Sequence, residues 1–258
     1  REHESSILGF GFILIVLLIW EAIPFLMPLS KGVELFFTTP VHIAVTLYQL
    51  IATGELQHHL YISATEFFIG LGLSIVVGLP VGIIMGRSTK INAMFDPFVT
   101  AFNATPRLVF LPLVLLWVGF GIWSKVVIVF IGALFPLLIN TYEGVKNADR
   151  TLINVVRSFG AGEWQVMKMV VLPNSLPYIV AGLRLAIGRA ILGVVVSEFF
   201  AASEGVGFLM ADAAGNYLVD VVFAGLVIFM GISLIMTSAV KKVESRLTKW
   251  RPEEVKTF

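Results

Sequence analysis

The segment from Tyr142 to Pro177 reads YEGVKNADRTLINVVRSFGAGEWQVMKMVVLPNSLP. It is a long polar interruption between two apolar runs. Its apolar residues recur at helical spacing on both sides of a pair of glycines, Gly160 and Gly162. Asp149 stands where its side chain can cap the first of the two patterns. We therefore predict two short amphipathic helices separated by a glycine break.

Such a segment displays an ordered apolar face on a loop, and an exposed apolar face needs something to cover it. The cover is either a partner protein or the membrane spans of the same chain. The residues alone leave both interpretations open.

The composition of the chain indicates a membrane protein. Hydrophobic residues make up 57% of the sequence and charged residues 14%, whereas soluble domains contain about 25% charged residues. The mean hydropathy is +0.92. The absence of cysteine excludes disulfide frameworks and thiol catalysis. Further spans follow the first apolar run, so we expect that run to be retained in the membrane and not cleaved as a signal peptide.

The hydropathy pattern predicts an all-α membrane protein, residues 1–258, that forms a single transmembrane domain with a loop at residues 143–175. Apolar runs this long imply helices, because the backbone polar groups must be satisfied within each segment. Six runs are long enough to span a bilayer: Ile7–Met27, Ile62–Gly86, Phe98–Gly119, Val126–Tyr142, Leu176–Ala201 and Leu218–Val240.

The distribution of basic residues predicts the orientation of these spans. If the N-terminus lies in the cytoplasm, thirteen Lys and Arg residues fall in cytoplasmic segments and only two, Lys31 and Lys125, fall outside. Basic residues concentrate on the cytoplasmic side of membrane proteins. We therefore expect both termini and the 143–175 loop to lie in the cytoplasm.

Glycines recur in the second predicted span, and prolines interrupt the third. Gly78, Gly82 and Gly86 recur every four residues, which lets another helix approach closely. Packing within one subunit is the favoured explanation, and a subunit interface is the alternative. Pro106 and Pro112 predict kinks or local unwinding in the third span.

The sequence lacks the motifs of an enzyme. It contains no Gly-Lys dipeptide and hence no P-loop, so we expect no ATP binding by this chain. Serine-hydrolase and zinc-protease motifs are also missing. His58 and His59 are adjacent and so point to different faces of a helix, which makes a metal site there unexpected. We predict no catalytic residue, no metal and no cofactor on this chain.

Charges inside predicted spans are costly and mark candidate functional sites. Arg107, Arg189 and Glu198 are our candidates for the substrate pathway. Arg107 either attracts a polar or anionic solute or pairs with a buried acid or with carbonyls freed by the prolines. Arg184 lies where it can reach the interface. Glu66 begins the second span on the outer side, where we expect it to be solvated.

The loop also resembles a known motif. Membrane subunits of ATP-binding-cassette importers carry Glu-Ala-Ala, three residues, Gly, nine residues and then Ile-x-Leu-Pro. Here Asn154-Val155-Val156 is followed after three residues by Gly160, and after nine more by Val170-Val171-Leu172-Pro173. Asn154 replaces the family's Glu, so a charged contact from that position is not expected.

Other segments resemble the branch of this family that imports sulfonates, taurine, nitrate, bicarbonate or pyrimidine precursors. They include GLPVGIIMGRS at residues 78–88 and LPYIVAGLRLAIGRAILGVVVSEFFAASEGVGFLM at residues 176–210. The resemblance implies a type I importer permease fold in a bacterial inner membrane, with the loop as the coupling element. The implied coupling residues are Asn154, Val155, Val156, Gly160, Ala161, Trp164, Leu172 and Pro173.

The same resemblance implies the partners: a second copy of this chain, two ATPase subunits that bind ATP and Mg²⁺, and an extracytoplasmic solute-binding protein. Membrane lipid surrounds the assembly, and nucleic acid has no part in it. Two alternatives remain from the residues themselves. One is a secondary transporter or channel that acts alone, and the other is a membrane scaffold without transport.

Overall fold

The computed structural model describes residues 2–26, 30, 32, 36–201 and 203–247, without the side chains of residues 2–6, 107 and 247. This part of the chain is built from helices and contains no β-strand. The elements in chain order are α1 (Glu2–Leu26), α3 (Pro40–Ala52), α4 (Glu55–Arg87), α5 (Thr89–Ala104), the 3₁₀ turn η1 (Arg107–Val109), α6 (Phe110–Val118), α7 (Ile122–Lys146), α8 (Arg150–Ser158), α9 (Glu163–Val166), the π-helical turn η2 (Met167–Val171), α10 (Leu172–Ala201), α11 (Val206–Gly215) and α12 (Val219–Leu247).

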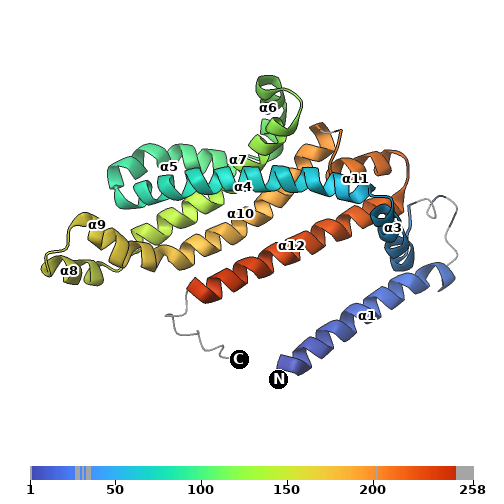
Figure 1. Ribbon diagram of the computed structural model, residues 1–258, viewed down its shortest axis with the longest axis horizontal. Coiled ribbons are helices and arrows are strands. Elements are labelled where there is room, and N and C mark those ends of the chain that lie inside the picture. The colour runs from blue at the N-terminus through green and yellow to red at the C-terminus, as the bar shows by residue number, and fades with distance from the viewer. Residues whose placement is uncertain (1, 27–29, 31, 33–35, 202, 248–258) are drawn as a thin grey trace.

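Three long helices form the core, with α7 packed along both α4 and α10 (Figure 1). The predicted close approach at the glycines of α4 is confirmed, and it occurs within one subunit. A Cβ added to Gly82 would lie 2.7 Å from the carbonyl oxygen of Leu138, and one added to Gly86 would lie 2.6 Å from the Cβ of Val145. These distances leave no room for a side chain, so the α4–α7 contact depends on glycine at both positions.

Five helical runs of the described chain have the length and hydropathy of a membrane span: Ile7–Leu26, Glu55–Arg87, Ile122–Lys146, Glu163–Ala201 and Val219–Arg246. They correspond to five of the six predicted spans, although Met27 lies outside the described residues. The span predicted over Phe98–Gly119 is not one helix, and the local unwinding predicted at Pro106 is confirmed. The chain leaves helical conformation at Thr105 and Pro106 and forms α5, η1 and α6 instead.

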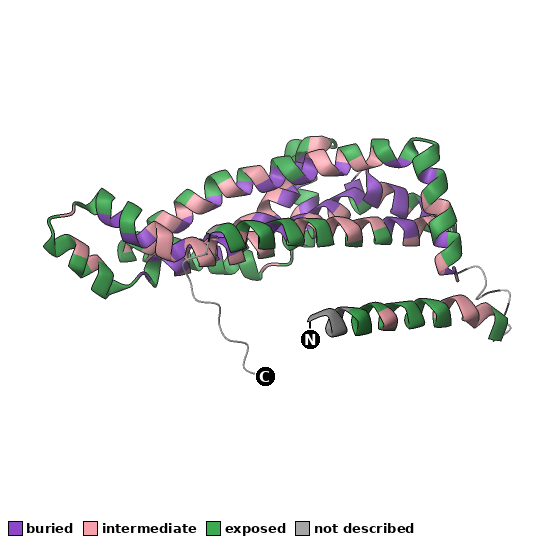
Figure 2. Ribbon diagram, turned by 60° about the horizontal axis from the view of Figure 1, so that its bottom comes forward, coloured by how far each residue is buried: buried purple, intermediate pink, exposed green. Residues whose placement is uncertain are grey.

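Helix α1 lies outside this core. In Figure 2 it runs apart from the bundle and is coloured as exposed along most of its length, and none of the 18-residue window that marks it as a span is buried. Trp20 near its C-terminal end contributes to the attachment. The Trp20 ring packs 5.5 Å from the Phe223 ring of α12, and its indole N–H donates to the carbonyl of Thr38 at 2.9 Å.

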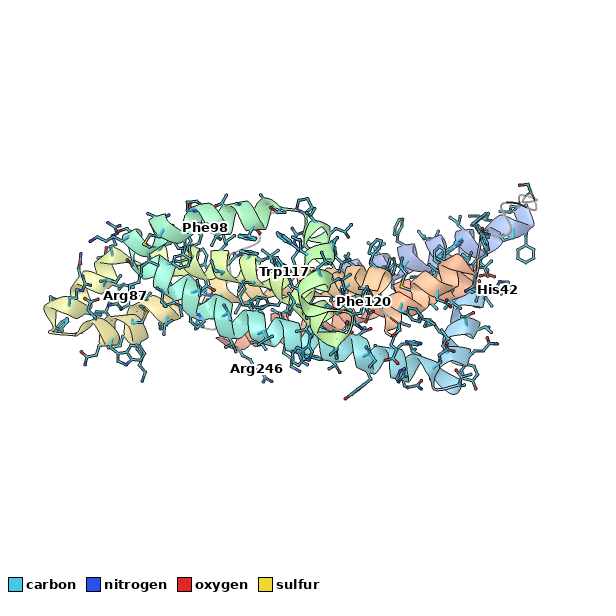
Figure 3. The ribbon with its side chains drawn as sticks, turned by 90° about the horizontal axis from the view of Figure 1, so that it is seen from above. His42, Arg87, Phe98, Trp117, Phe120 and Arg246 are labelled. Atoms are coloured by element: carbon cyan, nitrogen blue, oxygen red, sulfur yellow. The ribbon has the colours of Figure 1, made fainter. Side chains whose placement is uncertain are left out.

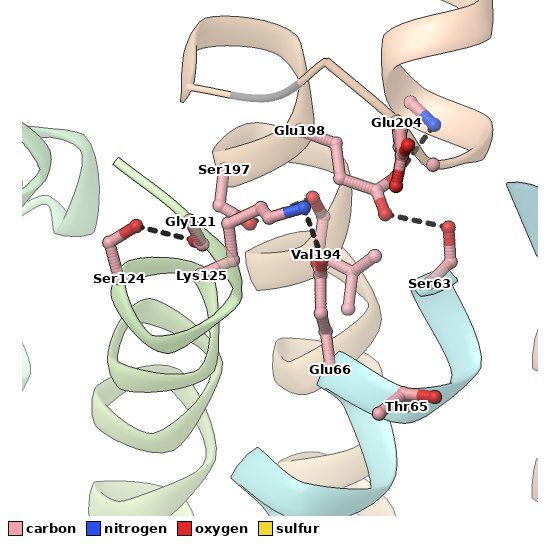
Figure 4. A network of polar contacts seen from close by, with 12 residues as sticks. Ser63, Thr65, Glu66, Gly121, Ser124, Lys125, Val194, Ser197, Glu198 and Glu204 are labelled. Atoms are coloured by element: carbon pink, nitrogen blue, oxygen red, sulfur yellow. Dashed lines mark hydrogen bonds and ion pairs between the residues drawn. The ribbon is translucent and has the colours of Figure 1, made fainter. Parts of the chain in front are cut away.

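A buried ion pair joins α4 to the first turn of α7. The Lys125 ammonium contacts the Glu66 carboxylate, and the two side chains are 6% and 0% exposed (Figure 4). The expectation that Glu66 is solvated is therefore wrong. Lys125, which was counted among the basic residues of the outer segments, is also buried. The sequence alone could not show that these two charges, 59 positions apart, meet inside the bundle.

Glu198 lies beside this pair and fastens α11 to the core (Figure 4). Its carboxylate accepts hydrogen bonds from the Ser63 hydroxyl at 2.6 Å and from the Gly207 N–H at 2.7 Å. The Ser63 hydroxyl oxygen in turn accepts from the Val206 N–H at 2.9 Å. A carboxylate at a helix N-terminus satisfies N–H groups that have no partner within the helix.

The Lys125→Met substitution should destabilise the protein strongly, because it leaves the Glu66 carboxylate buried without its cation. Breaking a buried pair in this way costs about 3–5 kcal/mol. The measurement is the apparent melting temperature of the purified protein in detergent. The double substitution Lys125→Met with Glu66→Gln removes both charges and should recover most of the loss. If the double variant melts as low as the single one, charge pairing is not what stabilises this site.

Candidate functional site

The segment after α7 folds as the predicted helix, break and helix. Asp149 caps α8, and its side chain accepts hydrogen bonds from the N–H groups of Thr151 at 2.7 Å and Leu152 at 3.4 Å. Capping by Asp satisfies donors that the first turn of a helix leaves free. The capping residue identified from the sequence is confirmed.

Gly160 makes the break. Its φ is +83°, a conformation that side-chain-bearing residues adopt rarely. The Gly160 N–H donates to the Arg157 carbonyl at 2.9 Å, and the Ala161 N–H donates to the Val156 carbonyl at 3.3 Å. This pair of bonds, together with the packing of Ala161 in the same cluster as Val156, is a Schellman motif. The structure therefore accounts for glycine at the position that the importer motif specifies.

A carboxylate holds the two helices of the break together. Glu163, the first residue of α9, accepts from Arg157 of α8 at 2.6 Å and from Arg87 at the end of α4 at 2.7 Å. Figure 3 shows Arg87 at the end of the molecule formed by α8 and α9. Glu163 thus connects α9 to α8 across the break, and it also connects α9 to the core helix α4. It was not among the predicted site residues, although opposite charges around a predicted break could have indicated it.

The helix that leaves the break continues without interruption into α10. The run from Glu163 to Ala201 passes through a π-helical turn, in which the Leu172 N–H bonds to the Met167 carbonyl five residues earlier. Pro173 follows directly and has no N–H to give to the ordinary helical ladder. The wider π turn accommodates the chain at this point, so the Leu172-Pro173 pair of the motif lies inside a rigid helix.

The segment 147–174, which we call the α8–α9 loop, has two apolar faces. The inner face packs on Val145, Val166 and Met167 and includes the predicted coupling residues Val156, Ala161 and Leu172. The outer face is exposed and includes Asn154, Val155, Gly160 and Trp164. Its largest side chains are Phe159, which is 87% exposed, and Trp164, which is 74% exposed.

A groove of about 420 Å³ opens on the outer side of this loop, lined by Leu152, Val155, Val156, Met169, Val170, Pro173 and Asn174. Val155, Val156 and Pro173 were predicted as site residues. Leu152, Phe159 and Met169 were not, although the helical periodicity of α8 places Leu152 and Val155 on one face. The loop therefore does not bury its outer face against its own spans.

The three predicted pathway residues do not form one cluster. Glu198 is 1% exposed and is occupied in anchoring α11. Arg189 precedes it by nine positions on the same helix, which is about 13 Å along the axis, and it is exposed. Arg107 begins the turn η1, but its side chain lies outside the described residues. Arg184 reaches the Glu244 carboxylate of α12, which accounts for one of the charges inside a span.

Comparison with known proteins identifies the family of this chain. Residues 78–249 match the model of the binding-protein-dependent transport system inner membrane component. The putative aliphatic sulfonates transport permease SsuC of Bacillus subtilis strain 168 is 37% identical over 97% of this chain and 90% of its own length. The taurine transport system permease TauC of Escherichia coli K12 is 31% identical over 95% of this chain and 90% of its own length.

Solved structures with the same fold come from other importers. One chain of the MetNI methionine transporter in an inward-facing conformation superposes with a TM-score of 0.66 at 20% identity, covering 73% of this chain and 94% of its own. A chain of an amino acid ABC transporter superposes with a TM-score of 0.59 at 18% identity, covering 80% and 98%. From the family model and these relatives, this chain belongs to the inner-membrane permease subunits of binding-protein-dependent ATP-binding-cassette importers.

Proposed function

We propose that this chain forms, with a second copy of itself, the solute pathway of an importer driven by two separate ATPase subunits and loaded by an extracytoplasmic solute-binding protein. The observation that carries the proposal is the exposed outer face of the α8–α9 loop. Phe159, Trp164 and the groove beside Val155 offer a large apolar surface at one end of the molecule. A surface of this kind fits a protein partner.

Motion of the loop would reach the core by two routes. The first is the unbroken helix from Glu163 into α10, and the second is the link from Glu163 to Arg87 at the end of α4. Both α10 and α4 pack on α7. An ATPase that pulls on the outer face therefore acts on two of the three core helices together, which is the kind of rigid-body shift that alternating access requires.

The excess of Lys and Arg in the segments on one side supports a cytoplasmic position for the α8–α9 loop and for both termini. ATP is available on that side. The charge of Arg107 and Arg189 supports a small anion as cargo. The names of relatives add support, since they include permeases for aliphatic sulfonates and taurine, and also one for formylaminopyrimidine.

The direct test is reconstitution of this chain with its ATPase and binding protein in vesicles. We expect copurification of the ATPase and uptake that requires ATP. The matched control removes the outer face by Phe159→Ser with Trp164→Ser, which should release the ATPase while leaving the permease folded. Uptake without an ATPase, driven by an ion gradient, would instead show a secondary transporter.

Substitution at Gly160 should uncouple transport. Gly160→Ala places a Cβ on a backbone with φ of +83°, which costs about 1–2 kcal/mol in this region and distorts the break. We expect ATP-driven uptake to fall several-fold. Gly162 is the control, because its φ of −73° suits any residue, and Gly162→Ala should transport normally. Equal uptake by the two variants would show that the backbone at Gly160 does not matter for coupling.

The charge at position 107 should matter for an anionic cargo. Arg107→Gln is expected to lower uptake of a labelled aliphatic sulfonate about tenfold, since contacts to a charged group contribute roughly 1.5–3 kcal/mol. Arg107→Lys keeps the charge and should retain most of the uptake. Basal ATP hydrolysis by the complex should be unchanged in both variants. If Arg107→Gln transports the sulfonate normally, the residue does not contact the cargo.

A further inference from the structure

The break between α5 and α6 is the feature that neither the hydropathy pattern nor the coupling role explains. Thr105 has extended backbone, φ −73° and ψ 130°, as expected for a residue before proline. Its N–H and its hydroxyl both donate to the Ala101 carbonyl, at 3.1 and 2.8 Å. Because Pro106 has no N–H, the Phe102 carbonyl loses its helical donor. The break therefore presents backbone groups that the helix does not satisfy.

Ring stacking fixes the depth of this break in the bundle. The Phe102 ring stacks on the Phe135 ring of α7, with centroids 6.0 Å apart and planes 5° from parallel. Phe110, on the other side of the break, stacks on Phe102 at 5.7 Å. Phe135 is near the middle of α7, about 16 Å of helix before Lys146. The break thus lies at mid-depth of a membrane-spanning helix.

At this depth the break is open. Asn103, Pro106 and Leu108 are exposed and Thr105 is partly exposed, and Figure 1 shows α6 projecting away from the core helices α4, α7 and α10. Irregular backbone cannot face lipid, since unsatisfied polar groups there cost several kcal/mol each. The break must therefore face protein or water.

A second observation concerns α10 at the same depth. Gly193 of α10 lies against Val129 of α7, and Gly182 lies against Pro136, so Arg189 between them is level with the middle of α7. Arg189 is exposed. A guanidinium at mid-depth also requires an environment other than lipid. Two separate elements thus call for polar surroundings at one level of the bundle.

We propose that the α5–α6 break, residues 103–109, is a water-facing station of the solute pathway, where Asn103, Thr105 and the freed Phe102 carbonyl contact a small hydrogen-bonding solute. This inference rests on the proposed transport function. It adds to the predicted Arg107 a set of neutral donors and acceptors that would form hydrogen bonds with a polar solute, whatever its charge. The prolines that interrupt the span are then part of the site, since they free its backbone groups.

The test introduces single cysteines. Any reaction of this chain with a thiol reagent can then be assigned to the introduced residue, because the chain has no cysteine of its own. Thr105→Cys and Asn103→Cys are made in the complete importer in membrane vesicles and treated with 2-sulfonatoethyl methanethiosulfonate, an anionic, water-soluble thiol reagent. Val76→Cys is the matched control. Val76 is 70% exposed on an unbroken part of α4, two residues from Gly78, which lies against Leu134 of α7.

We expect the cysteines at positions 103 and 105 to react about tenfold faster, or more, than the cysteine at position 76. The reason is that a thiol in apolar surroundings forms the reactive thiolate poorly. Reaction at position 105 should also abolish ATP-driven uptake, and reaction at position 76 should not. Equal reaction rates at positions 105 and 76 would overturn the proposal. The proposal would also be overturned if the cysteine at position 105 did not react with the reagent and instead formed a disulfide with the same cysteine of a second copy. That result would place the break in a packed subunit interface.

The labelling rates do not depend on transport. If the wild-type complex shows no ATP-driven uptake, the proposed function fails, while the rates still decide whether water reaches the break. If uptake is normal and only the labelling contrast is absent, the proposed function stands and the pathway lies elsewhere.

Discussion

A single unbroken helical run, from Glu163 to Ala201, connects the exposed loop at one end of the molecule to the anchor of α11 at the other. At about 1.5 Å per residue it is nearly 60 Å long, more than the thickness of a bilayer's hydrocarbon core. A rigid element of this length gives the α8–α9 loop a mechanical connection to the whole bundle. The core contacts of α7, the fixed position of α11 and the coupling role of the loop all depend on it.

The continuity of that run is maintained where it would ordinarily fail. Pro173 would interrupt an α-helical ladder, but the π turn at Met167–Val171 directly before it changes the hydrogen-bond register. At Pro106 no such turn precedes the proline and the helix ends there, whereas Pro97 and Pro136 lie inside α5 and α7 without one. Pro112 lies in the first turn of α6 and needs no N–H at that position.

Local signals in the sequence were sufficient for the α8–α9 loop. A cap at Asp149, a glycine at the required spacing and apolar periodicity predict the two helices and the break, because each depends on residues close in sequence. The glycines of α4 also predicted close packing correctly. Five of the predicted spans agree with the structure for the same reason, since hydropathy and length are local properties.

What the sequence could not provide depends on distant pairs or on depth. The Glu66–Lys125 pair joins two helices, and nothing near either residue shows that they meet. A hydropathy window is blind to hydrogen bonding, so the window alone runs one span across Pro106, where the proline itself predicted the unwinding correctly. The division of the α8–α9 loop into an inner and an outer face was also hidden. Val155 and Ala161 are both small apolar residues, and only the fold shows that Ala161 packs in the inner cluster while Val155 is exposed.

The two links from the loop to the core differ in kind. The link through α10 is covalent and helical. The link through Glu163, Arg157 and Arg87 consists of ion pairs whose side chains are 44–60% exposed. Mobile ions screen charges of that kind within about 8–10 Å at physiological ionic strength, whereas they leave a helix intact. The contribution of the ion pairs to the contact between the loop and α4 therefore falls as the salt concentration rises. The helical connection to α10 and the packing of Ile83 of α4 in the inner apolar cluster do not depend on salt in this way.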